Sequence, residues 1–164
     1  MEALISKMII PVDEMLWRIT LATACGLVLG LDHQMRKLSA GVGPHMLVAL
    51  GSAVTMLIVL ELHEQVLGQG NSPPDPTRAI HSLAIAAGIL CSGVVFVSKG
   101  HVYGLTTAAS LWMTSTLGVA AGAGFYQIAL AGLLFAMLAL TGMWCGTRHL
   151  TGSSSDKDDR SSSS

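Results

Sequence analysis

Residues 105–147 read LTTAASLWMTSTLGVAAGAGFYQIALAGLLFAMLALTGMWCGT and contain no Asp, Glu, Lys or Arg. A membrane-spanning helix needs about 20 mostly apolar residues, so this stretch is long enough for two such helices and a tight turn. Glycines cluster at Gly122 and Gly124, and glycine favours turns because it adopts backbone angles closed to other residues. The stretch therefore predicts two spans, at 105–121 and 125–144.

Three further stretches lack these charged residues: 19–31, 38–60 and 79–98. They add three candidate spans, at about 15–31, 44–62 and 79–98. Backbone groups in hydrocarbon must bond within the protein, which leaves helices or closed barrels. Barrel strands alternate polar and apolar residues, and residues 83–97 do not alternate. We therefore predict an all-α integral membrane protein, built as a bundle of about five transmembrane helices.

The composition supports this fold class. Charged residues make up 12% of the chain, against about 25% in soluble domains, and the mean hydropathy is +0.60. The net charge of -1 gives no basic excess for phosphates, so we expect the lipid bilayer as partner and no nucleic acid. The predicted parts are an N-terminal segment (1–14), a five-helix transmembrane domain (15–146) and a disordered, Ser-rich cytoplasmic tail (147–164).

Basic residues predict the orientation, because cytoplasmic loops carry an excess of Lys and Arg. With five spans, one face holds six basic residues: Arg36, Lys37, Lys99, Arg148, Lys157 and Arg160. The other face holds three: Lys7, Arg18 and Arg78. This bias predicts an N-terminus outside and a C-terminus in the cytoplasm. Arg18 lies within the first span, and we expect it to extend its charge to the headgroups.

Small residues recur at spacings of four along two of the predicted helices. Ala22, Gly26 and Gly30 share one face of the first, and Ala84, Gly88 and Ser92 share one face of the third. Small residues let helix backbones approach closely in membranes. Packing inside the bundle is the favoured interpretation, a dimer seam is the other, and the pattern does not separate them.

No hydrolase, kinase, nucleotide-binding or zinc motif is present in the sequence, so we do not expect an enzyme. The three cysteines are far apart, and we expect inert thiols. The six histidines lie mostly near span ends, where we expect interfacial side chains with one wet edge. These histidines are His33, His45, His63, His81, His101 and His149.

Glu61, His63 and Glu64 form a tight cluster of metal-ligand residue types. Magnesium prefers oxygen ligands, keeps several waters and often uses one or two carboxylates. A weak external Mg²⁺ site at Glu61 and Glu64 is therefore one hypothesis, although an ordinary solvated helix end is favoured over it. We expect no other cofactor.

Two further groups of polar residues lie at predicted helix ends. Asp32 closes the first span, and Arg36 follows four residues later, so the two can pair on one helix face. A function for Asp32 and a simple ion-paired helix stop remain equal alternatives. The run from Gly104 to Trp112 places Thr106 and Thr107 in the opening turns of a helix. Free N–H groups and hydroxyls there suit a polar or anionic ligand, or the hydroxyls cap and bond within the helix.

The segment YGLTTAASLWMTSTLGVAAGAGFYQIALAGLLFAMLAL (103–140) resembles the membrane domain of the MgtC/SapB family. Two further segments resemble the same family, GPHMLVALGSAV (43–54) and GLVLGLDHQMRK (26–37). The candidate functional residues in these motifs are Asp32, Arg36, His45, Gly104, Thr106, Thr107 and Trp112. The chain departs from the family at Asp32, where Glu is usual, at His33, where Arg is usual, and at Tyr103, where a basic residue is common.

The resemblance implies a multi-pass protein of a bacterial-type inner membrane, linked to magnesium homeostasis. The favoured function is a membrane regulator or interaction protein that acts on another membrane complex, or as a homo-oligomer. The alternative is a divalent cation (Mg²⁺) transporter or transporter subunit, for which Asp32 at a membrane edge is the motivation. A structural bundle without chemistry is the third hypothesis.

Overall fold

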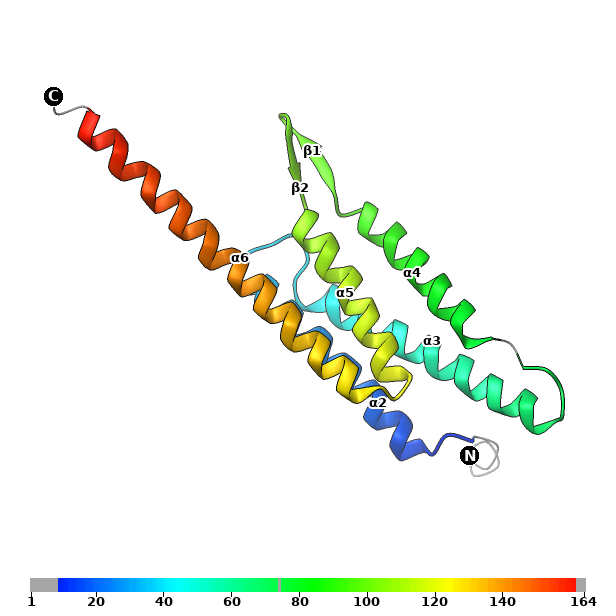
Figure 1. Ribbon diagram of the computed structural model, residues 1–164. Coiled ribbons are helices and arrows are strands. Elements are labelled where there is room, and N and C mark those ends of the chain that lie inside the picture. Colours follow the sequence, from blue (N-terminus) through cyan, green and yellow to red (C-terminus); the bar gives the residue numbers. More distant parts are fainter. Residues whose placement is uncertain (1–8, 74, 162–164) are drawn as a thin grey trace. The chain divides into compact units, whose positions relative to one another are not determined.

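The computed structural model describes residues 9–73 and 75–161, with side chains described as far as Trp144 (Figure 1). Within these residues the chain forms five α-helices and one short β-hairpin. The helices are α2 (Val12–Met35), α3 (Val42–Gly68), α4 (Pro76–Ser92), α5 (Leu105–Gly122) and α6 (Tyr126–Ser161), and the strands are β1 (Phe96–Ser98) and β2 (His101–Tyr103). The all-α prediction is confirmed, with five helices.

Three of the helices contain a segment that is long and apolar enough to cross a membrane. These segments are Val12–Met35, Val42–Gly68 and Tyr126–Trp144. Helix α4 has 17 residues, and the 18 residues of α5 include six Ser or Thr, so both are shorter or less apolar. Three candidate spans are therefore found where the sequence predicts five.

The chain divides into two compact units, Met1–Leu133 and Leu134–Ser164. The first holds α2 to α5, the hairpin and the first two turns of α6, and the second holds the rest of α6. Helix α6 includes residues 147–161, for which the sequence favours disorder. The boundary between a span and a tail stays a prediction there, and residues 162–164 lie outside the described residues.

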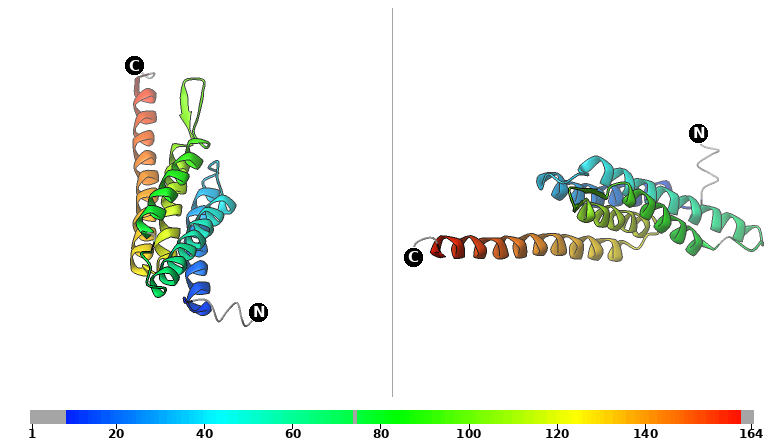
Figure 2. Two further views of the ribbon diagram at one scale, coloured as in Figure 1. Left: turned by 90° about the vertical axis from the view of Figure 1, so that its right-hand side faces the viewer. Right: turned by 90° about the horizontal axis from the view of Figure 1, so that it is seen from above.

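Helices α2, α3 and α5 pack against one another and form the core of the first unit (Figure 2). Glycines make this contact close. A Cβ atom on Gly26 would lie 2.7 Å from the carbonyl oxygen of His45, and one on Gly30 would lie 2.6 Å from Cα of Val42. On α5, a Cβ on Gly122 would lie 2.6 Å from the carbonyl oxygen of Ala53. These distances are too short for real Cβ atoms, so the helix backbones touch where side chains are absent.

Helix α4 lies outside this core and contacts α5 and, less extensively, α3. Its start is set by Asp75, whose carboxylate accepts hydrogen bonds from the backbone N–H and hydroxyl of Thr77. Among the residues of α4, all of which are described, only Ala87 is buried. A Cβ on Gly88 would meet no atom within 4 Å, so a packing role for Gly88 stays a prediction.

The predicted span 79–98 is wrong at its C-terminal end. Helix α4 ends at Ser92, and Phe96–Ser98 pairs antiparallel with His101–Tyr103. The run of β-branched and aromatic residues favours strands, and Lys99 and Gly100, with φ of 49° and 78°, make the two-residue turn that such hairpins use. Low charge fits a lipid-facing helix and an exposed hairpin equally, which is why the charge pattern missed the strands.

The span predicted at about 44–62 ends too early, because α3 continues to Gly68. The extension of Arg18 to the headgroups stays a prediction, and the structure adds partners for its side chain within the protein. Its Nε donates to Glu14 at 2.9 Å and its Nη1 donates to the carbonyl oxygen of Gly122 at 3.1 Å, at the C-terminal end of α5, where the helix dipole favours a cation. Tyr126 also donates a hydrogen bond to Glu14.

Candidate functional site

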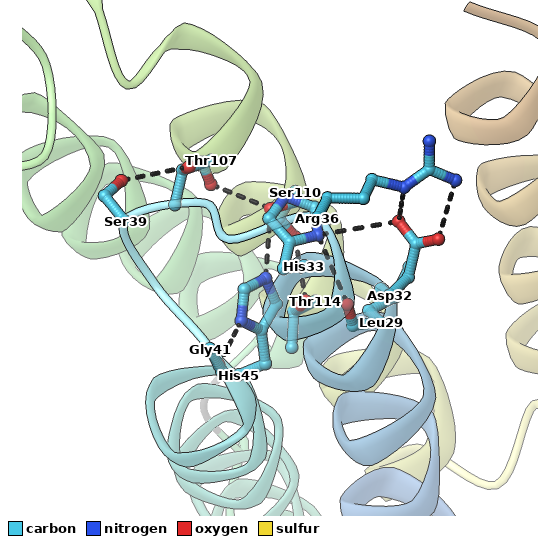
Figure 3. Close-up of polar contacts among 10 residues, drawn as sticks. All are labelled: Leu29, Asp32, His33, Arg36, Ser39, Gly41, His45, Thr107, Ser110 and Thr114. Atoms are coloured by element: carbon cyan, nitrogen blue, oxygen red, sulfur yellow. Dashed lines mark hydrogen bonds and ion pairs between the residues drawn. The ribbon is translucent and has the colours of Figure 1, made fainter. Parts of the chain in front are cut away.

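Polar side chains gather where α2 ends and where α3 and α5 begin (Figure 3). We call this group the polar cluster: Asp32, His33, Arg36, Ser39, His45, Thr107 and Ser110. Close packing of α2 on α3 at Gly26 and Gly30 brings the end of one helix against the start of the next. The cluster therefore depends on the glycine contacts of the core.

Asp32 and Arg36 form the ion pair that their spacing predicts. The guanidinium donates from Nε and Nη2 to the two carboxylate oxygens, at 2.8 and 2.7 Å. Both side chains are largely covered, with 12% and 14% of their surface exposed. A two-point contact of this kind fixes orientation as well as charge, so Asp32 is held in a single direction at the end of α2.

His45 is fully buried. Its Nδ1 lies 2.8 Å from the carbonyl oxygen of Gly41, and its Nε2 lies 3.0 Å from Oγ of Ser110 on α5. His45 therefore connects α3 to α5 through one side chain. This position does not fit an interfacial histidine with a wet edge, and that expectation is wrong for His45.

His33 is also fully buried, and the expectation of a wet edge is wrong here too. Its Nδ1 lies 3.2 Å from the carbonyl oxygen of Leu29, and its ring centre lies 4.8 Å from that of His45. Within the described residues, its Nε2 has no hydrogen-bond partner. Sequence reasoning missed His33 as a site residue, although it extends the face of Ala22, Gly26 and Gly30 by one more turn.

The GLTTAASLW run contributes to the cluster only in part. Thr107 is buried, and its hydroxyl accepts a hydrogen bond from Ser39 at 3.1 Å. Ser110 donates to the carbonyl oxygen of Thr107 at 2.9 Å, within α5. Thr106 is half-buried and Trp112 is 48% exposed. The run therefore supplies hydroxyls to the α2–α3 junction and presents an aromatic ring on the outside.

Gly104 determines the direction in which α5 leaves the hairpin. Its φ is 85°, in the left-handed region that other residues rarely adopt. A Cβ there would clash with the carbonyl oxygen of Val94. Glycine at this position therefore has a structural reason, and it sets where Thr107 lies.

The carboxylate of Glu61 is engaged elsewhere, away from the polar cluster. It accepts hydrogen bonds from the backbone N–H groups of Ile9 and Ile10, at 2.8 and 3.1 Å, and from Gln65 at 2.9 Å. Glu64 is exposed. In the part of the chain that the structure describes, no three His, Cys, Asp or Glu side chains converge on a metal site. A Mg²⁺ site at Glu61 and Glu64 stays a prediction.

Glu61 also lines an apolar cavity of about 300 Å³ between α2 and α3. The remaining lining residues are Ile10, Met15, Ile19, Val54, Leu57, Ile58, Leu62 and Gln65. With its oxygens bonded to Ile9 and Ile10, Glu61 holds the chain that enters α2 against α3. In the structure, Glu61 therefore has a structural role.

Comparison with known proteins finds similar chains in bacteria. "Putative magnesium transporter YhiD" of Escherichia coli K12 is 33% identical over 128 residues, covering 77% of this chain and 59% of the relative. Protein SapB of Bacillus subtilis is 29% identical over 128 residues (77% and 55%), and protein MgtC of Salmonella typhimurium LT2 is 32% identical over 118 residues (72% and 47%). The chain thus spans about half to three fifths of the length of these relatives.

No solved structure matches the chain. The MgtC family model matches residues 19–145, which include most of α2, all of α3 to α5, the apolar part of α6 and the whole polar cluster. With its glycine-packed helices and this match over most of its length, the chain belongs to the MgtC family.

Proposed function

We propose that this MgtC family protein is a regulator or interaction protein of a bacterial-type inner membrane, linked to magnesium homeostasis. In this proposal all five helices cross the bilayer, with the N-terminus outside and the C-terminus in the cytoplasm. The protein acts through helix contacts with another membrane complex or a second copy, and it is not an enzyme. The name of one relative in this family, a putative magnesium transporter, supports the link to magnesium.

The exposure of α4 is the observation that carries the proposal. Ile85, Ile89 and Leu90 are 54%, 69% and 48% exposed, and the small face around Gly88 is open. In membranes, helices associate by close packing at small residues. Helix α4 therefore offers a free packing face, whereas the glycine faces of α2 and α5 are already used inside the core.

Site-specific photocrosslinking tests this role. A photoreactive residue is placed at Ile85 or Ile89 on α4, and at Ile58 on α3 as a control of similar exposure (61%). We expect both α4 positions to crosslink to one membrane protein in cells, and the Ile58 position to crosslink only to lipid. Equal crosslinking from all three positions, or lipid adducts alone, would contradict the proposal.

Transport of Mg²⁺ is the alternative function, and the position of Asp32 is the observation that favours it. A largely covered carboxylate at a membrane edge is often functional, and one relative carries a transporter name. The purified chain is reconstituted in liposomes that contain a Mg²⁺ dye, beside an Asp32→Asn variant. Flux in the unaltered chain that the variant loses would favour transport over regulation, and no flux above empty vesicles would exclude it.

A further inference from the structure

The bonding partners of His45 restrict where its hydrogens lie. Nδ1 faces the carbonyl oxygen of Gly41, which can only accept, so Nδ1 carries a hydrogen whether the ring is neutral or charged. Nε2 faces Oγ of Ser110. The Ser110 hydroxyl has a single hydrogen to donate, and it also accepts. The protonation of His45 therefore decides which way that hydrogen points when Nε2 and Ser110 are bonded.

Ser110 has two acceptors within reach. Its Oγ is 3.0 Å from Nε2 of His45 and 2.9 Å from the carbonyl oxygen of Thr107. When the hydroxyl points to His45, Nε2 accepts and the ring is neutral. When it points to Thr107, Nε2 donates to Ser110 and the ring is protonated. Rotation of one hydroxyl therefore gives Nε2 of His45 a bonding partner in both states.

His33 is a second buried ring next to the first. Its Nδ1 faces the carbonyl oxygen of Leu29 and so donates, which leaves a lone pair on Nε2 of the neutral ring. Within the described residues this Nε2 makes no hydrogen bond of normal geometry, and its polar neighbour on α5 is the backbone of Thr106. Buried polar atoms are nearly always bonded, so an exception calls for an explanation. A carbonyl oxygen accepts from Nε2 only when this nitrogen carries a proton, so proton uptake by the ring is such an explanation.

The charged groups around the two rings are few. On α2, Oδ2 of Asp32 lies 4.0 Å from Nδ1 of His33, but both oxygens of Asp32 already bind Arg36. Helix α3 contributes His45 itself. Helix α5 has no ionisable side chain between Leu105 and Gly122. Two protonated rings would therefore share one carboxylate that is already paired.

The remaining neighbouring segments add no negative charge. Lys37, in the connection from α2 to α3, is exposed and basic. On α4, which packs on α5, Cys91 donates from Sγ to the carbonyl oxygen of Ala108. Ring centres 4.8 Å apart make the two sites strongly coupled, because like charges at this distance repel.

We propose that His33 and His45 form a proton-binding site that holds one proton between them and excludes a second. The proton comes from water and forms an N–H bond with the Nε2 lone pair of either ring, without any transfer of electrons to another group. When it resides on His45, the Ser110 hydroxyl turns to Thr107. Proton binding therefore changes the contact between α3 and α5, where α2 also packs. The proposal does not depend on the regulatory function above.

Counting protons tests the proposal on the full chain in lipid nanodiscs. Proton uptake between about pH 8 and about pH 5, the range in which histidines titrate, is compared for the unaltered chain and for His33→Gln, His45→Gln and the double variant. His101→Gln on the exposed strand β2 is the matched control. We expect the double variant to lose about one proton, and each single variant to lose well under half a proton, because the remaining ring takes up the shared proton.

Two outcomes would overturn the proposal. If each single variant loses a whole proton, the rings titrate independently, and if the double variant loses none, the rings do not titrate. Size exclusion and circular dichroism identify variants that do not fold. Imidazole ¹⁵N NMR on the unaltered chain gives a test without substitutions: both rings are expected to be partly protonated at the acid end. Two fully protonated rings, or two neutral ones, would refute the shared proton.

Discussion

The α2–α3–α5 core and helix α4 carry the same sequence pattern with different structural outcomes. In the core, glycines such as Gly26 and Gly118 place one backbone directly on another. On α4, Gly88 sits in an equivalent row of small residues and meets nothing within 4 Å. A four-residue spacing of small side chains thus predicts a face suited to close packing. It does not predict whether the same chain, another chain or lipid covers that face.

Replacing Gly118 by Ala should give the largest effect. A Cβ at Gly118 would lie 2.9 Å from Cβ of Ser52 and 3.0 Å from Cα of Ala49, and would clash with the Ala49 carbonyl oxygen. Because the contact is with backbone, α3 and α5 must move apart, and overpacking of this kind costs about 1–3 kcal/mol or more. Denaturant unfolding in detergent micelles measures this loss of stability. Gly51→Ala, on an open part of α3, is the control, and equal midpoints for both variants would contradict the close contact.

Replacing Arg18 by Met should give the next largest effect. Met keeps the apolar length of the side chain but loses the bond from Nη1 to the carbonyl of Gly122, which a charged donor strengthens. We expect a loss of about 1–3 kcal/mol, with faster hydrogen exchange at the end of α5. Arg18→Lys keeps the charge and should recover part of the loss. A Met variant as stable as the unaltered chain would contradict a stabilising bond from Arg18 to Gly122.

Acid should loosen the start of α4 and leave the core unchanged. The hydrogen bonds from Thr77 lower the pKa of Asp75, so this cap is present above the ordinary Asp pKa of about 3.9 and is lost as the pH falls through the lower folded value. Protection from hydrogen exchange, taken relative to the intrinsic amide rate at each pH, should fall in the first turn of α4 at that pH and stay high at Gly118. In Asp75→Ala, protection in this turn should be low at every pH. Protection in acid that matches neutral pH would refute the cap.

The sequence predicted the helices better than it predicted their surroundings. The uncharged stretches gave α2, α3, α5 and the apolar part of α6, and the spacing of Asp32 and Arg36 gave their ion pair. The burial of His33 was missed, because a histidine at a helix end suits water as well as a glycine-packed junction. The hairpin at 96–103 was missed because low charge does not distinguish a lipid-facing helix from an exposed hairpin. The burial of His33 depends on partners distant in sequence, whereas the hairpin is local and its missed signal is the β-branched and aromatic run around Lys99 and Gly100.

Gly88→Ala should have the smallest effect, with the opposite sign to Gly118→Ala. A Cβ at Gly88 meets open space, and Ala is a better helix former than Gly by up to about 1 kcal/mol. The free energy of unfolding of the monomer should therefore stay the same or rise by a fraction of that amount. Gly88→Leu extends the test to association: if α4 packs on a partner, the larger side chain leaves the monomer stable but reduces crosslinking at Ile85 and Ile89. A destabilised Gly88→Ala monomer would instead place Gly88 inside the fold, and the contrast between α4 and the core would no longer hold.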